Sequence, residues 1–211
     1  MTETSTETEN LLQSAIQGDD AALAELFAHY RKRLRRMVQI RMDRRLLGRV
    51  DPSDVLQEAY LDLAKRLPDY AKDQAYPFFL WLRMLTGQRL MLTHRFHLQT
   101  AMRDAGQEVS LYHKAMPEAN SMSLAANLLG RMTSISEKAM RAEVQVKLQE
   151  TLNSMDPMDR EILVLRHFEE LTNGEAAEVL GIKKAAASNR HMRALKRLKE
   201  TLQSIPGMLD R

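Results

Sequence analysis

The stretch from Thr172 to Gln203 constrains the fold of this chain more than any other part of it. Thr172 and Glu175 have the spacing of a capping box, in which each side chain satisfies a free backbone N–H at the start of a helix. Gly181 then permits the positive φ of a tight turn, Ile182 supplies a buried anchor, and a second helix is expected to reach Gln203. A short helix, a glycine turn and a longer helix predict a helix-turn-helix unit.

The second of these helices is strongly basic, with seven Lys or Arg and no acidic residue between positions 183 and 199. In helix-turn-helix units the start of the second helix enters the major groove, and the basic remainder contacts phosphates. A merely solvated basic face is the alternative, but the capping box and the glycine turn favour DNA binding. Ala187, Met192 and Leu195 are expected to face inward. The candidate DNA contacts are Lys183, Lys184, Ser188, Asn189, Arg190, Arg193, Lys196 and Arg197.

The rest of the chain also favours helix. Its 211 residues include only 8 Gly, 6 Pro and 5% aromatics, whereas the unbranched residues that lose little rotamer freedom in a helix are abundant. Apolar residues recur at spacings of three and four over residues 23–38, and Asp51-Pro52-Ser53-Asp54 has the caps of another helix start. We expect that helix to stop at Pro68, and a further helix to run from Phe78 to about Arg103. The predicted fold class is all-α.

Loss of periodicity between residues 106 and 136 places the domain boundary. This segment is rich in Ser, Asn, Ala and Met, and it favours a linker with a short helix around Leu124 to Leu129. The expected organisation is two small helical domains joined by that linker. In chain order, we expect a polar tail over 1–8, a helical domain over 9–104, a linker over 105–135, a helix-turn-helix domain over 136–205 and a tail over 206–211.

Composition excludes several classes of protein. The sequence has no cysteine, which rules out disulfides, thiolate metal sites and a cysteine nucleophile. The N-terminus, MTETSTETEN, is polar and acidic, unlike a signal peptide, and no apolar run approaches the roughly 20 residues of a membrane helix. We therefore expect a cytoplasmic protein with no membrane insertion.

Histidine spacing gives the one hint of a metal site. His94 and His97 lie three residues apart, as do His167 and Glu170, so each pair can share a helix face. Nothing nearby supplies a third ligand, and the sequence has neither a Gly-rich phosphate loop nor a G-x-S-x-G motif. We expect no enzymatic activity, no metal and no cofactor.

The formal net charge of +3 hides segregated blocks of charge. Residues 31–49 contain nine Lys or Arg against the single acid Asp43, whereas acids gather at 51–62 and 156–178. Such segregation indicates separate basic and acidic faces. The basic cluster between Arg31 and Arg49 fits either DNA phosphates or an acidic partner, and the sequence does not choose between them.

Three segments, in order along the chain, resemble bacterial RNA polymerase sigma factors. The stretch DPSDVLQEAYLDLAKRL resembles the polymerase-binding helix of sigma region two, with Asp54, Leu56, Gln57, Glu58 and Tyr60 in the typical pattern. PFFLWLRMLTGQRLMLTHRFHLQTAMRD resembles the helix that follows, and the stretch from LNSMDPMDREILVLRHFEELTNGEAAEVLGI onward is similar to region four. Regions two and four joined by a linker are typical of the extracytoplasmic-function group, and the flanking sequence is closest to planctomycete variants.

The resemblance implies partners and roles. It implies that region two binds core RNA polymerase and the minus-ten element, that region four binds the minus-thirty-five duplex, and that the chain is a monomer when free; an anti-sigma factor, common in this group, is a further candidate partner. The implied polymerase-binding residues are Asp54, Gln57, Glu58 and Asp62. The implied minus-ten contacts are Arg83, Arg89, His94, Arg95 and Arg103. The helix-turn-helix residues named above become the minus-thirty-five contacts.

Two details of the resemblance are expectations of a different kind. The family captures an unstacked base in the loop before the minus-ten helix, here about Pro68 to Tyr76, whereas Phe78, Phe79 and Trp81 are expected to be core residues. The recognition helix starts Lys-Lys-Ala-Ala-Ala in place of a frequent Gly-Thr-Val step, so its target sequence is expected to be atypical.

The competing interpretation is a helix-turn-helix regulator with an N-terminal helical sensor domain, which would be expected to dimerise.

Overall fold

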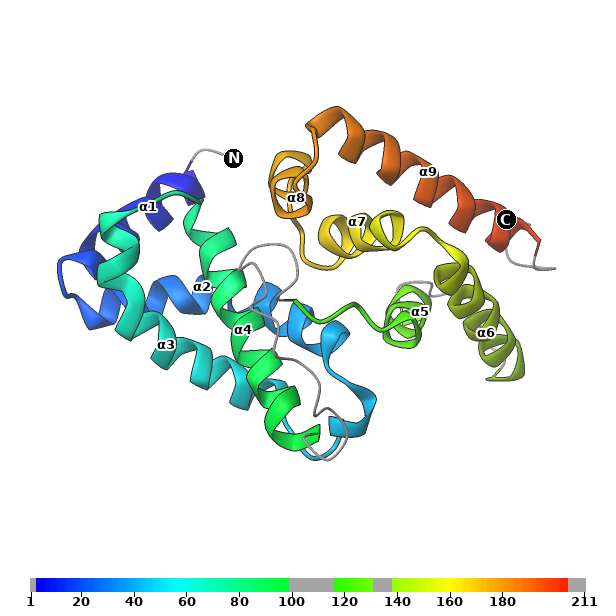
Figure 1. Ribbon diagram of the computed structural model, residues 1–211, viewed down its shortest axis with the longest axis horizontal. Helices are drawn as coiled ribbons and strands as arrows, with labels where there is room; N and C mark the ends of the chain where they lie inside the picture. The colour runs from blue at the N-terminus through cyan, green and yellow to red at the C-terminus, as the bar shows by residue number, and fades with distance from the viewer. Residues whose placement is uncertain (1–2, 99–115, 131–137, 205–211) are drawn as a thin grey trace. The chain divides into compact units, whose positions relative to one another are not determined.

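The computed structural model describes residues 3–98, 116–130 and 138–204 (Figure 1). Every regular element within these ranges is a helix, which confirms the all-α prediction. The helices form two compact units, one of residues 1–38 and 43–117, the other of residues 39–42 and 118–211. None of the described helices is long and apolar enough to cross a membrane.

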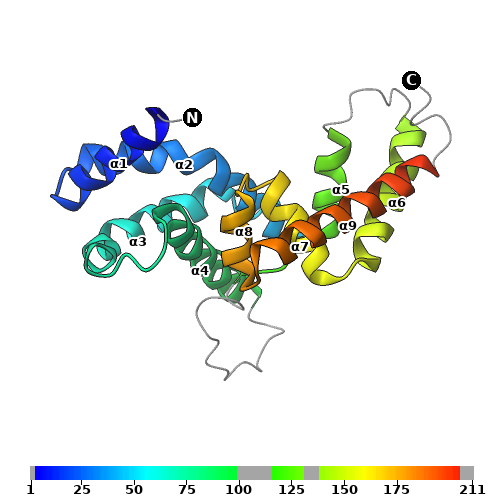
Figure 2. The same cartoon turned by 90° about the horizontal axis from the view of Figure 1, so that it is seen from above.

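The first unit is built from α1 (Glu3–Ile16), most of α2 (Asp20–Arg41), the short 3-10 helix η1 (Arg44–Leu46), α3 (Pro52–Lys72) and α4 (Phe78–Leu98). Helices α3 and α4 pack side by side (Figures 1 and 2). Because α1 starts at Glu3, most of the expected N-terminal tail is helical. Fully buried leucines from α2, α3 and α4 form the core: Leu26, Leu34, Leu56, Leu63, Leu82, Leu85 and Leu90.

Helix α3 begins as expected and ends later than expected. Asp51 and Asp54 form a capping box around Pro52, which occupies the first helical position. The prediction that Pro68 ends the helix is wrong, because α3 continues through it to Lys72. The turn beyond the proline is held by Tyr70, which is buried and donates a hydrogen bond from its hydroxyl to the Tyr76 carbonyl at 3.0 Å. Tertiary packing therefore outweighs the backbone hydrogen bond that proline cannot make.

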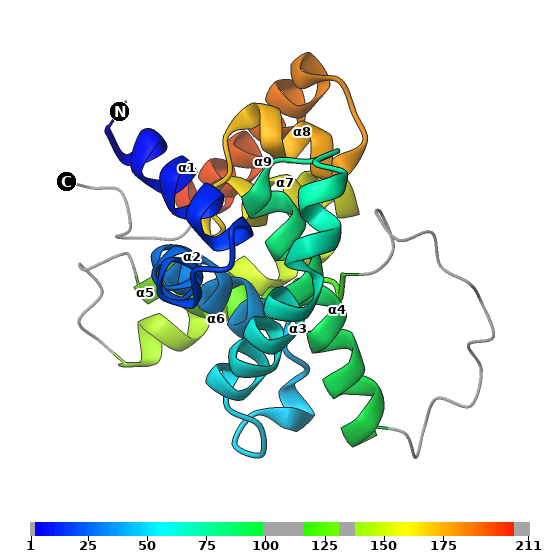
Figure 3. The ribbon, with the colours of Figure 1, turned by 90° about the vertical axis from the view of Figure 1, so that its left-hand side faces the viewer.

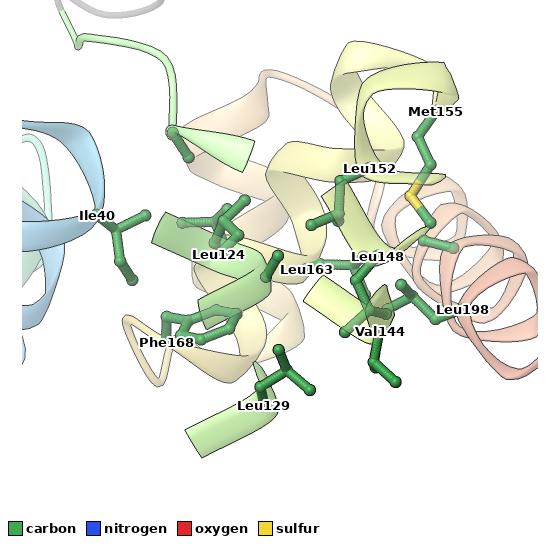
Figure 4. Close-up of a cluster of buried hydrophobic side chains, with 14 residues drawn as sticks. Ile40, Leu124, Leu129, Val144, Leu148, Leu152, Met155, Leu163, Phe168 and Leu198 are labelled. Atoms are coloured by element: carbon green, nitrogen blue, oxygen red, sulfur yellow. The ribbon is translucent and has the colours of Figure 1, made fainter. Parts of the chain in front are cut away.

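The second unit is built from α5 (Ser121–Gly130), α6 (Lys138–Ser154), α7 (Pro157–His167), α8 (Asn173–Leu180) and α9 (Lys184–Gln203). The short helix expected near Leu124 is present, but it is a structural part of this unit and packs against α6 (Figure 2). The boundary expected at residue 135 therefore lies close to residue 117. Side chains from α5, α6, α7 and α9 share one apolar cluster (Figure 4), which includes Leu124, Leu129, Val144, Leu148, Leu152, Leu163, Phe168 and Leu198.

Helices α7, α8 and α9 lie against one another (Figure 3) and contain the expected helix-turn-helix. The capping box of Thr172 and Glu175 is present at the start of α8, and Gly181 ends that helix at φ 64° and ψ 32°. Ala187 is buried as expected, but Met192 is 66% exposed and the prediction that it faces inward is wrong. The buried stripe of α9 follows Ala187, Ala194 and Leu198, and a residue two positions before Ala194 lies on another side of the helix.

Candidate nucleic-acid interface

The first turns of α9 present short polar and basic side chains to solvent. Lys183, Lys184, Ser188 and Asn189 are all exposed. The side-chain amide of Asn173 in α8 donates to the Ser188 hydroxyl and to the Lys184 carbonyl, both at 2.9 Å. These bonds tie the start of α9 to α8 and leave the lysines on the open surface. The residues sequence reasoning placed at a major-groove surface are thus together and accessible.

Two arginines of the same set are held by carboxylates of α7. Arg190 Nη1 lies 2.6 Å from Asp159 Oδ1 and 3.1 Å from Asp156 Oδ1, and Arg193 Nε lies 2.6 Å from Asp159 Oδ2. Burial alone would raise the pKa of Asp159, but the hydrogen bonds from Arg193 and Arg190 outweigh it and lower the pKa. Sequence reasoning missed the role of Asp159 as the anchor of α9, because its arginine partners lie 31 and 34 residues further along the chain.

The C-terminal half of α9 leaves its basic residues near solvent. Lys196 is exposed and 3.9 Å from Glu200 one turn away, a distance that adds little stability at the surface. Arg197 is exposed and donates from Nη2 to the Ser154 hydroxyl at 3.3 Å. Both side chains remain available to contact the phosphates of a nucleic-acid backbone.

On α3, the expected polymerase-binding residues share one side of the helix. Asp54, Gln57 and Glu58 are exposed, and Asp62 is half-buried. Asp62 Oδ2 accepts from Arg89 Nε at 2.9 Å and from Arg89 Nη2 at 2.5 Å, and Glu58 lies 3.5 Å from the same arginine. The acidic face is therefore continuous with a residue expected to contact the minus-ten element.

The expected minus-ten residues of α4 fall in different environments. Arg83 is 5% exposed, because the first half of α4 is buried around most of its circumference. His94 Nε2 accepts from the Asp43 backbone N–H at 3.1 Å, and burial, aided by the Arg45 charge, lowers the pKa of His94 although Asp43 opposes the shift. Arg95 is exposed, and Arg103 lies outside the described residues. These side chains do not form a single surface.

Aromatic residues before and at the start of α4 form an internal cluster. The Tyr70 ring stacks on Trp81 with centroids 4.5 Å apart, and Phe78 and Phe79 are buried. Arg33 of α2 lies over the Phe79 ring at 3.7 Å from its centroid, a cation–π contact. The expectation that Phe78 and Phe79 are core residues is thus met, and Tyr70 is occupied by packing.

Several members of the basic cluster of residues 31–49 have internal partners. Besides Arg33, Arg45 pairs with Asp43 at 2.7 Å, and this hydrogen-bonded contact lowers the pKa of Asp43 to about 2. Arg41, grouped with the second unit, is buried and bonds to Glu169 at 2.7 Å and to Glu161. Burial would lower the pKa of Arg41, but the two carboxylates raise it. The cluster is therefore not a uniform ligand-binding surface.

Comparison with known proteins shows which family the chain resembles. Residues 145–198, which cover the end of α6 through most of α9, match the family model described as Sigma-70, region 4. The ECF RNA polymerase sigma factor SigD of Mycobacterium tuberculosis is 28% identical over 200 residues, covering 89% of this chain and 86% of that protein. ShbA of Streptomyces griseus, also an ECF RNA polymerase sigma factor, is 29% identical over 191 residues, covering 90% of this chain and 92% of that protein. Over about nine-tenths of its length the chain is therefore similar to extracytoplasmic-function sigma factors.

A solved structure agrees with this fold. CnrH, in a complex with the cytosolic domain of CnrY, aligns with a TM-score of 0.55 and 21% identity, covering 94% of this chain and 98% of CnrH. The region-four match begins within α6 and ends within α9, and α3 and α4 lie in the segment that resembles region two.

Proposed function

We propose that this chain is a sigma factor, which binds core RNA polymerase and directs it to promoters through their minus-ten and minus-thirty-five elements. The observation that carries the proposal is the helix-turn-helix of α8 and α9 inside the region-four match, with an exposed polar and basic start to α9. A helix with such a start can contact base edges in the major groove and also the backbone phosphates.

For the minus-thirty-five element, we infer a division of labour along α9. Lys183, Lys184, Ser188 and Asn189 contact the major groove, because they are exposed at the end of the helix that enters it. Lys196 and Arg197 contact phosphates. Arg190 and Arg193 orient the helix through Asp159 and reach DNA only from that fixed position.

For the polymerase, we infer that the exposed acidic-polar face of α3, bearing Asp54, Gln57 and Glu58, pairs with basic groups of the core enzyme. Asp62 supports this face through Arg89. Among the candidate minus-ten contacts, exposed Arg95 is the one that the described residues favour. Arg103 stays in the proposal on the resemblance alone, and buried Arg83 is left out of it.

We further propose that the chain acts in the cytoplasm as one copy per polymerase, and that it makes and breaks no covalent bond itself. CnrH was solved with the cytosolic domain of CnrY, and we propose that an anti-sigma factor likewise binds this chain. The helix-turn-helix regulator with a sensor domain is not favoured, because sigma factor relatives align over about nine-tenths of the chain.

Reconstitution tests the proposal directly. The purified chain is mixed with core RNA polymerase of the same bacterium, passed through a sizing column, and supplied with a genomic DNA pool and nucleotides. Co-elution and transcription from defined start sites are expected, and the start sites then reveal the promoter elements. Binding to duplex DNA without any association with the polymerase would contradict the proposal and favour the regulator.

A further inference from the structure

Two histidines that lie far apart in the sequence meet between α7 and α9 of the second unit. His167 is the last residue of α7, and His191 lies in the second turn of α9. Their Nε2 atoms are 2.8 Å apart, and the ring centroids are 5.0 Å apart with 36° between the ring planes. Sequence spacing pairs His167 with Glu170, whereas the structure gives it a partner from another helix.

The distance between the two nitrogens is the one that a single metal ion requires at right-angled positions. Two imidazole nitrogens, each about 2.0–2.1 Å from an ion, lie about 2.8–3.0 Å apart at an angle of 90° and about 3.3–3.4 Å apart at the tetrahedral angle. The observed 2.8 Å fits the right angle of tetragonal Ni²⁺ or Cu²⁺ better than tetrahedral Zn²⁺. It also fits a hydrogen bond between the rings, and the experiment below distinguishes the two.

The protonation of the pair also favours a metal. A histidine nitrogen binds a metal only when it carries no proton, because the lone pair forms the bond. Burial lowers the pKa of His191 below its ordinary 6.5, and the charges of His167 and Arg166 lower it further. Protons therefore compete little for His191 near neutral pH. Both rings are half-buried, so water can still reach an ion between them.

The other ligands of such an ion come from solvent. Over the described residues, no group of three or more His, Asp or Glu is arranged to hold a metal. The site therefore has half of the protein ligands of a structural zinc site, and the nearby charge of Arg166 opposes a cation. Half of the binding free energy of a four-ligand site corresponds to a Kd of about 1–200 µM.

We propose that His167 and His191 form a two-histidine site for a divalent transition metal with tetragonal geometry, Ni²⁺ or Cu²⁺. The ion joins the end of α7 to the turn of α9 that also carries Arg190 and Arg193. It stabilises the folded second unit, because the separated histidines of an unfolded chain bind it far less tightly. The site does not depend on promoter recognition. It departs from the expectation of no metal, which weighed only ligands near one another in the sequence.

The first test is thermal unfolding of the untagged full chain at pH 7.5 after removal of metal with a chelator. Ni²⁺ at about 1 mM should raise the melting temperature by about 2 °C or more, whereas Mg²⁺, which prefers oxygen ligands, should not. His167→Gln and His191→Gln should each abolish the shift. His97→Gln is the matched control and should keep it, because His97 is an exposed histidine of the first unit.

Electron paramagnetic resonance of the chain loaded with one equivalent of Cu²⁺ identifies the ligands without relying on the stability of any variant. Wild type and His97→Gln should show splitting from two equatorial nitrogens. His167→Gln and His191→Gln should each lose at least one of them. Circular dichroism of the two variants checks that they remain folded.

Three results would overturn the proposal. Absence of either the Ni²⁺ shift or the two-nitrogen signal in the wild type would mean that the pair is only a hydrogen bond. A shift that survives in both His167→Gln and His191→Gln would place the bound ion elsewhere. Loss of the shift and the two-nitrogen signal in His97→Gln would assign the ion to the first unit.

Discussion

Arg193 and Asp159 form a two-point ion pair, with Arg193 Nε 2.6 Å from Oδ2 and Arg193 Nη2 3.0 Å from Oδ1. Arg190 donates to the same carboxylate at 2.6 Å. Asp159 is itself only 8% exposed, so α9 is fixed to α7 by a carboxylate that water scarcely reaches. Arg190 and Arg193 therefore hold α9 in position against α7, whether or not DNA is bound.

Replacing Asp159 by Asn should destabilise the protein. The amide keeps the shape of the carboxylate but loses charge-assisted hydrogen bonds with Arg190 and Arg193, at an expected cost of about 1–3 kcal/mol in the free energy of unfolding. Urea titration followed by circular dichroism measures the change. Asp69→Asn is the control, because Asp69 is exposed and pairs with exposed Lys72. Equal stability of the two variants would show that the α7–α9 pair contributes nothing.

Acid should weaken the same contact. The pKa of Asp159 is lower in the folded chain than the ordinary value of 3.8, so the unfolded chain binds a proton first as the pH falls. The stability that this group contributes is complete above about pH 4 and is lost as the pH falls through the lowered pKa. Urea titrations at several pH values should show the difference between wild type and Asp159→Asn shrinking towards low pH. A difference that stays constant would contradict the assignment.

His94 should make stability fall at mildly acidic pH. Burial, aided by the Arg45 charge, lowers its pKa below 6.5, and its ring nitrogen accepts the hydrogen bond of the Asp43 N–H. The unfolded chain therefore takes up a proton first, and stability is lost as the pH falls from about 6.5 towards the lowered pKa. His94→Gln should flatten the pH dependence of the unfolding free energy between pH 7.5 and 5.5. An unchanged slope would sink this explanation.

Arginine and lysine variants of α9 should differ in kind. Lys183→Ala and Lys184→Ala should weaken promoter binding and reduce its salt dependence, by about one unit of the log–log slope for each phosphate contact removed, while leaving stability unchanged. Arg193→Ala should lower both promoter affinity and unfolding free energy, because it releases Asp159. Fluorescence anisotropy at several salt concentrations and urea titration measure the two properties. Lys72→Ala, on an exposed residue of the first unit, should change neither.

The turn between α8 and α9 should require glycine. Gly181 has a φ of 64°, and alanine there costs about 1–2 kcal/mol. Gly174→Ala is the matched control: Gly174 lies inside α8 and an added Cβ would meet the Thr172 hydroxyl at an ordinary 3.9 Å, so alanine should be neutral or stabilising. The melting temperature should therefore fall for Gly181→Ala and stay the same or rise for Gly174→Ala. Equal destabilisation would mean that φ at Gly181 is not the cause.

Local signals predicted the helix starts accurately. The cap at Asp51, the capping box at Thr172 and the turn at Gly181 depend on side chains within three or four residues, and the structure confirms them. Pro68 and Met192 were mispredicted because packing partners distant in sequence decide whether a helix passes a proline or buries a methionine.

The candidate interfaces were less predictable for a related reason. Arg190 and Arg193 meet Asp159 across 31 and 34 residues, and Arg89 meets Asp62 across 27, so no local pattern reveals these pairs. The helix-turn-helix pattern and the family resemblance marked the three arginines as DNA contacts without revealing their carboxylate partners. Arg83 was marked in the same way, but it lies on a part of α4 that is buried on nearly every side.

The position of α5 has a consequence for protein engineering. Leu124, Ala125 and Leu129 are buried with side chains of α6, α7 and α9, so α5 is an integral part of the second unit. A chimera that transplants α5 to α9 into a sigma factor should place its fusion joint before Glu118. A joint at residue 136, where the sequence alone suggested the border, would remove α5 from the transplanted unit. The leucines of α6, α7 and α9 that pack against α5 would then be exposed to water.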